Sequence, residues 1–202
     1  AVIYAMSDRG LIDLTQSILE YLPDELWRNL HIFKGTDYSD KIRVIDLINQ
    51  TSGLADYEMD IKGDNSVINR LKKEDFILTE YEAIDLTKSL EAKFVPGEDK
   101  AHYSNVNAIL LGLIAEGISG KPLVELYEEY ISIPLGLENT ELITKNNHIY
   151  AYLGNEKVNR TQYISSALAC GGLVATVDDM MMFIKSFYNG KLFSKTHIED
   201  IK

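Results

Sequence analysis

Cysteine, metal-binding patterns and long apolar runs are scarce in this sequence. The single cysteine, Cys170, cannot form a disulfide within the chain, and we interpret it as a small buried residue. The histidines are His31, His102, His148 and His197, and their spacing is not that of a metal site, so we expect no metal and no cofactor. No apolar run reaches the roughly 18 residues that a membrane-spanning helix needs.

Positive charge is also in short supply. The sequence has 20 Lys and Arg against 31 Asp and Glu, which gives a formal net charge of -11. This balance repels a phosphate backbone, and we expect no nucleic-acid partner. With 46% hydrophobic and 25% charged residues, the composition is that of a globular protein with one core. No repeat or linker divides the chain, so residues 1–202 are expected to lie in one domain.

The usual signatures of a serine nucleophile are missing. The chain contains no Gly-x-Ser-x-Gly, and no serine is followed three positions later by a lysine. The first residues resemble the tail of a helix that has no capping residue and stops at Gly10. We therefore expect further polypeptide to precede Ala1 in the parent protein.

Helical periodicity is the main pattern that is present. The strongest instance follows Tyr103-Ser104-Asn105, and its apolar positions are Val106, Ile109, Leu110, Leu113 and Ile114. Its other faces are apolar too, so we expect a central, buried helix whose first residues are held rigidly where the core meets a cleft.

Other helices are expected at residues 66–73, 79–90 and 122–136. The last long helix is expected to begin at the N-cap Thr176 and to end before Gly190. Its core-facing side chains would be Met180, Ile184, Phe187 and Tyr188, and Met180-Met181-Met182 would fill gaps in the core. Alternating strand patterns are scarce, so the chain is predicted to be mainly α.

Four stretches, at residues 10–23, 42–54, 94–140 and 171–180, occur in a characteristic order. They include Thr51-Ser52-Gly53, Tyr103-Ser104-Asn105 and Gly171-Gly172. Together they resemble the beta-lactamase/penicillin-binding-protein-like serine hydrolases, the group of class C beta-lactamases, D-alanyl-D-alanine carboxypeptidases and related esterases. Gln50 departs from the pattern, because the group usually has His there.

This resemblance implies a two-lobed α+β fold in which a helical lobe packs beside an antiparallel sheet. Residues 1–202 would form a partial domain, chiefly the helical lobe, with most of the sheet missing. The Ser-x-x-Lys motif is expected just before Ala1, and the final Lys-Thr-Gly strand beyond Lys202. Lys195-Thr196-His197 is no substitute, because a short helix is expected to begin at Thr196.

The resemblance also implies a chemistry. In this group a serine attacks an acyl carbon, a lysine assists it, and the tyrosine of Tyr-x-Asn relays the proton. Tyr103 would be that relay, and Asn105 would bind substrate. A phenol acts as a base only when nearby cations lower its pKa, and the nucleophilic Ser and its Lys are absent from this chain. We expect the chain alone to be inactive.

Other interpretations stay open. From local pattern alone, Tyr103 would be a tyrosine at the edge of the core, Ser104 an N-cap and Asn105 a polar first-turn residue. The Thr51-Ser52-Gly53 and Gly171-Gly172 segments are interpreted as tight turns without chemistry. The chain could also be a non-catalytic binding module or pseudoenzyme of the same fold.

The expected partners follow from the resemblance and from the missing sheet. The substrate would be a small acyl compound, such as a beta-lactam, a D-alanyl peptide or an ester, or a cell-wall component. Helices without their sheet should expose an apolar surface, which favours a homo-oligomer. By resemblance, the parent protein would work outside the cytoplasm.

Overall fold

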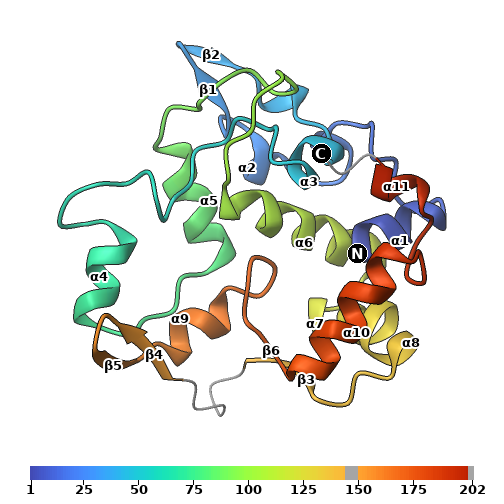
Figure 1. Ribbon diagram of the computed structural model, residues 1–202. Helices are drawn as coiled ribbons and strands as arrows, with labels where there is room; N and C mark the ends of the chain where they lie inside the picture. Colours follow the sequence, from blue (N-terminus) through green and yellow to red (C-terminus); the bar gives the residue numbers. More distant parts are fainter. Residues whose placement is uncertain (144–149, 200–202) are drawn as a thin grey trace.

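The computed structural model describes residues 1–143 and 150–199, so His148 lies outside the described part. In this part helices are the main regular structure, and they are joined by long irregular segments (Figure 1). The α-helices are α1 (Val2–Asp8), α2 (Asp24–Trp27), α3 (Val44–Ile48), α4 (Val67–Lys73), α5 (Glu80–Lys88), α6 (Asn105–Ser119), α7 (Leu123–Tyr127), α8 (Ile133–Leu135), α9 (Thr161–Ser166), α10 (Val177–Tyr188) and α11 (Thr196–Glu199). Short 3-10 turns lie at Ile18–Glu20 and Ser39–Lys41.

Strands form only short antiparallel pairs among the described residues. They are β1 (Ile32–Phe33) with β2 (Thr36–Asp37), β3 (Thr140–Leu142) with β6 (Leu173–Ala175), and β4 (Tyr150–Leu153) with β5 (Glu156–Asn159). In the longest register Tyr150 pairs with Asn159 and Leu153 with Glu156. Each pair is a ribbon at the edge of the molecule (Figure 1), so the helices supply the core.

Helix α6 crosses the middle of the molecule and contacts α1, α3, α5 and α7 (Figure 1). Val106, Leu110 and Ile114 are completely buried along it. The helix ends at Gly120, whose φ of 66° places it in the left-handed conformation of a helix stop. The prediction of a central, buried helix is confirmed.

Several predicted helix starts are also confirmed by their capping hydrogen bonds. The Ser66 hydroxyl accepts a bond from the Asn69 N–H at 3.2 Å and begins α4. Thr79 begins α5 with a capping box, in which the Glu82 carboxylate accepts the Thr79 N–H at 2.8 Å. The Thr176 hydroxyl accepts the Asp179 N–H at 3.3 Å and begins α10.

The helix expected at 122–136 is present, but it is not uniform. Pro122 is the N-cap of α7, and residues Glu128–Ser132 form a π-helical turn between α7 and α8. Gly136 ends the run with a φ of 64°. The sequence predicts the helix and its end. The π turn could not be predicted, because it adds one residue to the hydrogen-bonded loop without changing the spacing of the apolar residues.

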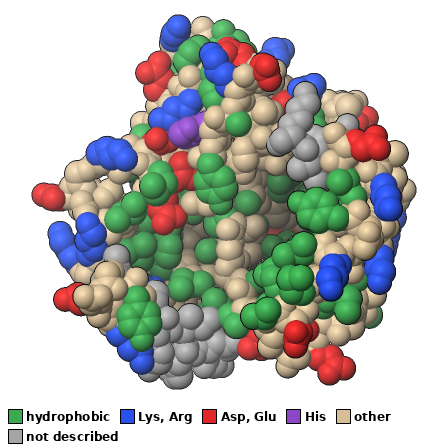
Figure 2. Space-filling model, in the orientation of Figure 1, with side chains coloured by type: hydrophobic (Ala, Val, Ile, Leu, Met, Phe, Trp, Pro, Cys, Tyr) green, Lys and Arg blue, Asp and Glu red, His purple; other side chains and the backbone are tan. Residues whose placement is uncertain are grey.

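Helix α10 contradicts the prediction that Met180, Ile184 and Tyr188 face the core. These side chains are 47%, 41% and 63% exposed, and the Met181 and Met182 side chains are exposed too. Phe187 alone of the expected stripe turns inward, where its ring meets Phe193 at 4.9 Å. The stripe is solvent-exposed because no described element covers that face. Figure 2 shows that hydrophobic side chains gather beside a hollow in the visible face.

Cys170 is only half-buried, so its interpretation as a buried residue needs correction. Its thiol donates to the Ala167 carbonyl at 3.4 Å and lies 3.9 Å from the Tyr57 hydroxyl. His197 belongs to α11, the short helix predicted to begin at Thr196, and its ring bonds the Asp8 carboxylate at 3.0 Å. This contact fastens the last described helix to α1.

Candidate active site

Tyr103 and Asn105 lie together at the start of α6, as their motif predicts. Asn105 is the first residue of the helix, and the Tyr103 hydroxyl donates to the Asn105 side-chain oxygen at 3.3 Å. The Tyr103 side chain is 64% exposed, so it is accessible to a ligand. The buried helix behind the pair fixes the two side chains relative to the rest of the molecule.

Ser104 does not serve as the simple helix cap that the local pattern suggests. It occupies the N-cap position, but its buried hydroxyl donates to the Ala55 carbonyl at 3.0 Å. The Asp56 carboxylate accepts the Asn105 N–H at 2.6 Å instead, and it also accepts the Glu58 N–H at 2.9 Å. The negative charge of Asp56 is attracted by the positive end of the α6 dipole. This attraction and the hydrogen bond to the Asn105 N–H hold Asn105 in place.

Gln50 connects the segment after α3 to the start of α6. Its side-chain oxygen accepts the Ser104 N–H at 2.9 Å and the Asn107 side-chain amide at 2.5 Å. Its backbone carbonyl accepts the His102 N–H at 3.0 Å. The backbone of Gln50 has a φ of 60°, which costs free energy in a residue other than glycine. The position that departs from the family pattern is therefore built into the support of the site.

The glycines of the two predicted tight turns are required by backbone geometry. Gly53 has a φ of 74°, and a Cβ there would lie 2.1 Å from the Phe94 carbonyl oxygen. Gly172 has a φ of 80°, and its Cβ would lie 3.0 Å from the Ile164 carbonyl oxygen. Both positions agree with the structural interpretation, in which these turns shape the site without taking part in chemistry.

Glu58 and Tyr163 also belong to the site, and no motif in the sequence indicated them. The Asn105 side-chain amide donates to the Glu58 carboxylate at 3.0 Å, and Tyr163 makes a further side-chain hydrogen bond to Glu58. Burial, with help from the Asp56 carboxylate, raises the pKa of Glu58. Tyr163 comes from α9, far along the chain, so only the folded structure brings it to Glu58.

The electrostatic environment of Tyr103 favours the neutral phenol. Partial burial raises the pKa of Tyr103, and Cys170, Asp56 and Glu58 add to the shift. No ion pair among the described residues brings Lys or Arg to Glu58 or Asp56. These residues alone therefore do not make Tyr103 a base at neutral pH.

An apolar cavity of about 270 Å³ lies between α6, the start of α1 and α10. Ala108, one helical turn after Asn105, is part of its wall, together with Val2 and Phe183. Figure 2 shows hydrophobic side chains around the hollow of this face. The face of α6 that is not packed against other helices thus opens into this space.

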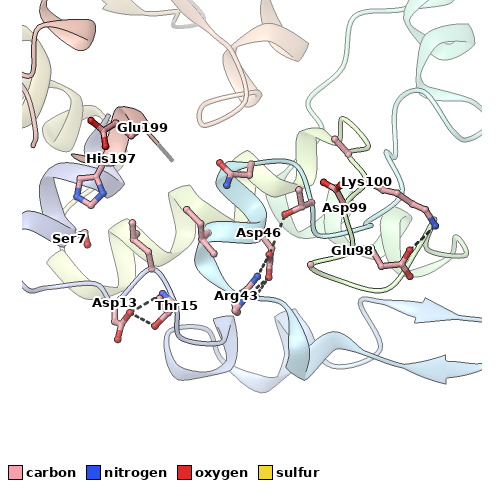
Figure 3. A pocket seen from close by; sticks show the side chains of 16 residues that line it. Ser7, Asp13, Thr15, Arg43, Asp46, Glu98, Asp99, Lys100, His197 and Glu199 are labelled. Carbon is pink, nitrogen blue, oxygen red and sulfur yellow. Dashed lines mark hydrogen bonds and ion pairs between the residues drawn. The ribbon is translucent and has the colours of Figure 1, made fainter. Parts of the chain in front are cut away.

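A second cavity, of about 1080 Å³ and lined mainly by polar and charged side chains, lies between α1, α3, α11 and the loop at residues 97–101 (Figure 3). Both of its cationic Arg and Lys side chains form ion pairs within the cavity. Arg43 binds Asp46 at 2.8 Å, and Lys100 binds Glu98 at 2.7 Å. Neither Tyr103 nor Asn105 lines it, so we do not assign the site there.

Within residues 1–143 and 150–199, no group of three or more His, Cys, Asp or Glu side chains is arranged to hold a metal ion. Within the same ranges, no helix has both the length and the apolar character to cross a membrane.

Comparison with known proteins gives a match over almost the whole chain. The family model described as "Beta-lactamase" matches residues 1–200. The D-alanyl-D-alanine-carboxypeptidase/endopeptidase AmpH of Escherichia coli (strain K12) is 30% identical over 112 residues, which are 54% of this chain and 28% of that protein. The matched part is thus a small share of this curated relative.

Solved structures agree in fold. The D-stereospecific amidohydrolase from Streptomyces sp. superposes with a TM-score of 0.78 at 24% identity, over 98% of this chain and 60% of that one. The octameric penicillin-binding protein homologue from Pyrococcus abyssi superposes with a TM-score of 0.72 at 22% identity, over 98% of this chain and 44% of that one. At these identities the likeness establishes the fold alone.

Proposed function

Because this chain belongs to the beta-lactamase family, we propose that its 202 residues carry one half of a serine acyl-hydrolase site. The observation that supports this most is the pair formed by Tyr103 and Asn105 at the start of a buried helix. Hydrogen bonds that Ser104 and Asn105 donate to Gln50, Asp56 and Ala55 hold that helix start, so the pair is preorganised. We further propose that residues 1–202 form one partial domain.

In the proposed reaction a serine forms an ester with the acyl group of the substrate, and water then releases it. Tyr103 relays the proton between the serine and the leaving group, and Asn105 donates a hydrogen bond to the substrate. The Ser-x-x-Lys pair is not among these residues, and Tyr103 has a raised pKa here. The chain alone is therefore expected to bind but not to turn over substrate.

The substrate class proposed is acyl compounds of the kind that the family hydrolyses, namely beta-lactams, D-alanyl peptides and esters. The curated relative named above is a D-alanyl-D-alanine carboxypeptidase, and the amidohydrolase that shares the fold is D-stereospecific. Both descriptions favour a D-configured acyl group. An extracytoplasmic site of action follows from the same proposal, since the cell-wall peptides that carry D-alanine lie there.

Intact-mass measurement after treatment with a fluorophosphonate or penicillin tests the proposal. The probe is added to the 202-residue chain and to the product of the complete reading frame that encodes it. We expect a covalent adduct on the latter only. An adduct on the 202-residue chain would refute our account of the nucleophile, and no adduct on either would refute the acyl-hydrolase proposal.

A second candidate is a non-catalytic binding module of the same fold. The raised pKa of Tyr103 favours this candidate. Burial and the nearby carboxylates keep the phenol neutral, so Tyr103 does not readily take the proton of a serine. Absence of an adduct together with retained ligand binding would support it.

We also propose that the chain forms a homo-oligomer through α10. Val177, Ile184 and Tyr188 lie on one face of this helix and are exposed. Ile184→Lys places a charge in that face, so sedimentation velocity is expected to show a smaller species than for the wild type. Lys185→Ala is the control on a neighbouring polar position. A wild-type chain that sediments as a monomer at all concentrations would refute the proposal.

A further inference from the structure

The short segment at residues 56–60 contacts the chain on both sides of the proposed proton relay. At its first residue, the Asp56 carboxylate accepts the Asn105 N–H at 2.6 Å. At its last residue, the Asp60 carboxylate lies 2.9 Å from Nε2 of His102. His102 directly precedes the relay and Asn105 lies two positions after it, so this one segment holds the relay from both ends.

The two acids also close the segment on itself. The Asp56 carboxylate accepts the N–H groups of Glu58 and Met59 at 2.9 and 2.7 Å. The Asp60 carboxylate accepts the Asp56 N–H at 2.8 Å, and the Asp60 N–H donates to the Asp56 carbonyl at 2.9 Å. The contacts before and after the relay therefore belong to one hydrogen-bonded unit, and a shift at Asp60 also moves Asp56.

Lys93 supplies the positive charge that this unit needs. Its Nζ lies 3.0 Å from Oδ1 of Asp60, while His102 bonds the other carboxylate oxygen. Partial burial alone would raise the pKa of Asp60, but the Asp56 N–H and these two side chains lower it. The Asp60 carboxylate is therefore charged at neutral pH, which strengthens each hydrogen bond that it accepts.

The Tyr103 side chain depends on such backbone support. It is 64% exposed, and its hydroxyl bonds Asn105 at 3.3 Å, longer than the roughly 2.5–3.0 Å usual for two oxygen atoms. A group that transfers a proton must lie within hydrogen-bonding distance of its partner, and a misplacement of about 1 Å can cost a hundredfold in rate. The position of the relay is thus set mainly by the residues on either side of it.

We propose that Asp60 and His102 are positioning residues, whose hydrogen bond fixes the backbone before Tyr103 relative to the start of α6. They act through the relay and are assigned no contact with the reacting atoms. The proposal deepens the proposed function, since it depends on Tyr103 and Asn105 forming the site.

Amide hydrogen exchange of the 202-residue chain measures this positioning without a substrate. His102→Ala removes the bond to Asp60, so the 56–60 segment opens more easily and the Asn105 N–H should exchange about tenfold faster. His102→Gln keeps an N–H donor at the end of the side chain and should exchange within about threefold of the wild type. The N–H of the buried Leu110, farther along α6, should exchange at the wild-type rate in both variants.

His197→Ala is the matched control. It removes another histidine–aspartate hydrogen bond, of 3.0 Å, which joins α11 to α1. The exchange of the Asn105 N–H should stay that of the wild type in this variant. The proposal is overturned if His102→Ala leaves that exchange unchanged, if His102→Gln accelerates it equally, or if the Leu110 N–H accelerates by the same factor, which would indicate general destabilisation.

The effect on the reaction is measured with the product of the complete reading frame. Intact mass gives the rate of adduct formation over a range of penicillin concentrations. His102→Ala should lower the limiting rate about tenfold and change the half-saturating concentration less than about threefold, because the relay acts in the chemical step. Equal limiting rates would reject a role of His102 in the reaction.

This outcome is separable from that of the acyl-hydrolase proposal. The absence of an adduct on every complete protein would reject the hydrolase, and hydrogen exchange would still decide whether Asp60 and His102 position the start of α6. An adduct that forms at the same rate in the wild type and in His102→Ala would retain the hydrolase and reject the positioning role.

Discussion

Helices α6 and α10 are the two longest helices among the described residues, and their apolar side chains lie in opposite environments. In α6 the residues Val106, Leu110 and Ile114 are completely buried between α1, α3, α5 and α7. In α10 the residues Ile184 and Tyr188 form an apolar face that points to solvent. Both helices have apolar side chains at helical spacing, but only α6 has neighbours on the faces that carry them.

This difference shows that an apolar stripe specifies a helix but not its partner. The spacing of side chains defines the face that would gain from burial, whereas the rest of the fold decides whether anything covers it. The candidate functional side chains follow the same division, because Tyr103 and Asn105 lie at the start of the helix that is packed. A rigid helix start is what a preorganised site requires.

The comparison predicts its largest effect for truncations of the buried helix. Leu110→Ala on α6 removes a completely buried side chain, so we expect the free energy of unfolding to fall by about 3 kcal/mol. Ile184→Ala on α10 removes a partly exposed side chain and should cost less than about 1 kcal/mol. Urea denaturation measures both. Similar losses in the two variants would mean that α10 is covered in solution.

A smaller effect is expected for the support of the α6 start. Gln50→Ala leaves the Ser104 N–H and the Asn107 amide without their acceptor, which should cost about 1–3 kcal/mol. Gln162→Ala, at an exposed glutamine of α9, is the control and should change stability by less than about 0.5 kcal/mol. If denaturation shows equal stability for the two variants, then Gln50 does not hold the start of α6.

The starts of several helices, including α6, could be predicted from the sequence because each depends on residues next to it in the chain. Capping residues such as Ser66 and Thr79 act on the helix that follows them, and the Tyr-Ser-Asn motif directly precedes the periodic stretch of α6. Glu58, which bonds Asn105, and Tyr163, which bonds Glu58, could not be predicted in this way. Glu58 lies 47 positions before Asn105, and Tyr163 comes from another helix, so their approach depends on tertiary packing.

The error at α10 has a related cause. Its N-cap, Thr176, and its end before Gly190 were predicted correctly, since both depend on adjacent residues. The direction of its apolar face depends on which elements pack nearby, and the sequence pattern is the same for a covered and an uncovered stripe. The π turn at Glu128–Ser132 could not be predicted either, because it changes the backbone hydrogen bonds without changing the spacing of the apolar residues.

The cap of α10 should contribute less than the packing of α6. Thr176→Ala removes the acceptor of the Asp179 N–H, and we expect a loss of about 1 kcal/mol in the free energy of unfolding. Thr176→Ser keeps the hydroxyl and should retain most of that stability. Thermal unfolding followed by circular dichroism compares the two. If alanine and serine behave alike, the hydroxyl does not cap the helix in solution.

The smallest effect is expected from the charge of Glu58, and it should depend on pH. Because the pKa of Glu58 is raised in the folded state, the folded protein holds a proton there that the unfolded chain has released. The contribution of Glu58 to stability should therefore fall as the pH rises above the ordinary glutamate pKa of about 4.3 and until the raised pKa is passed. Glu58→Gln removes this contribution, so its stability relative to the wild type should increase through that range. Denaturation curves of both proteins from acid to neutral pH measure the difference. A constant difference would mean that folding leaves the proton affinity of Glu58 unchanged, and the site at the start of α6 would then be more open to water than its hydrogen bonds indicate.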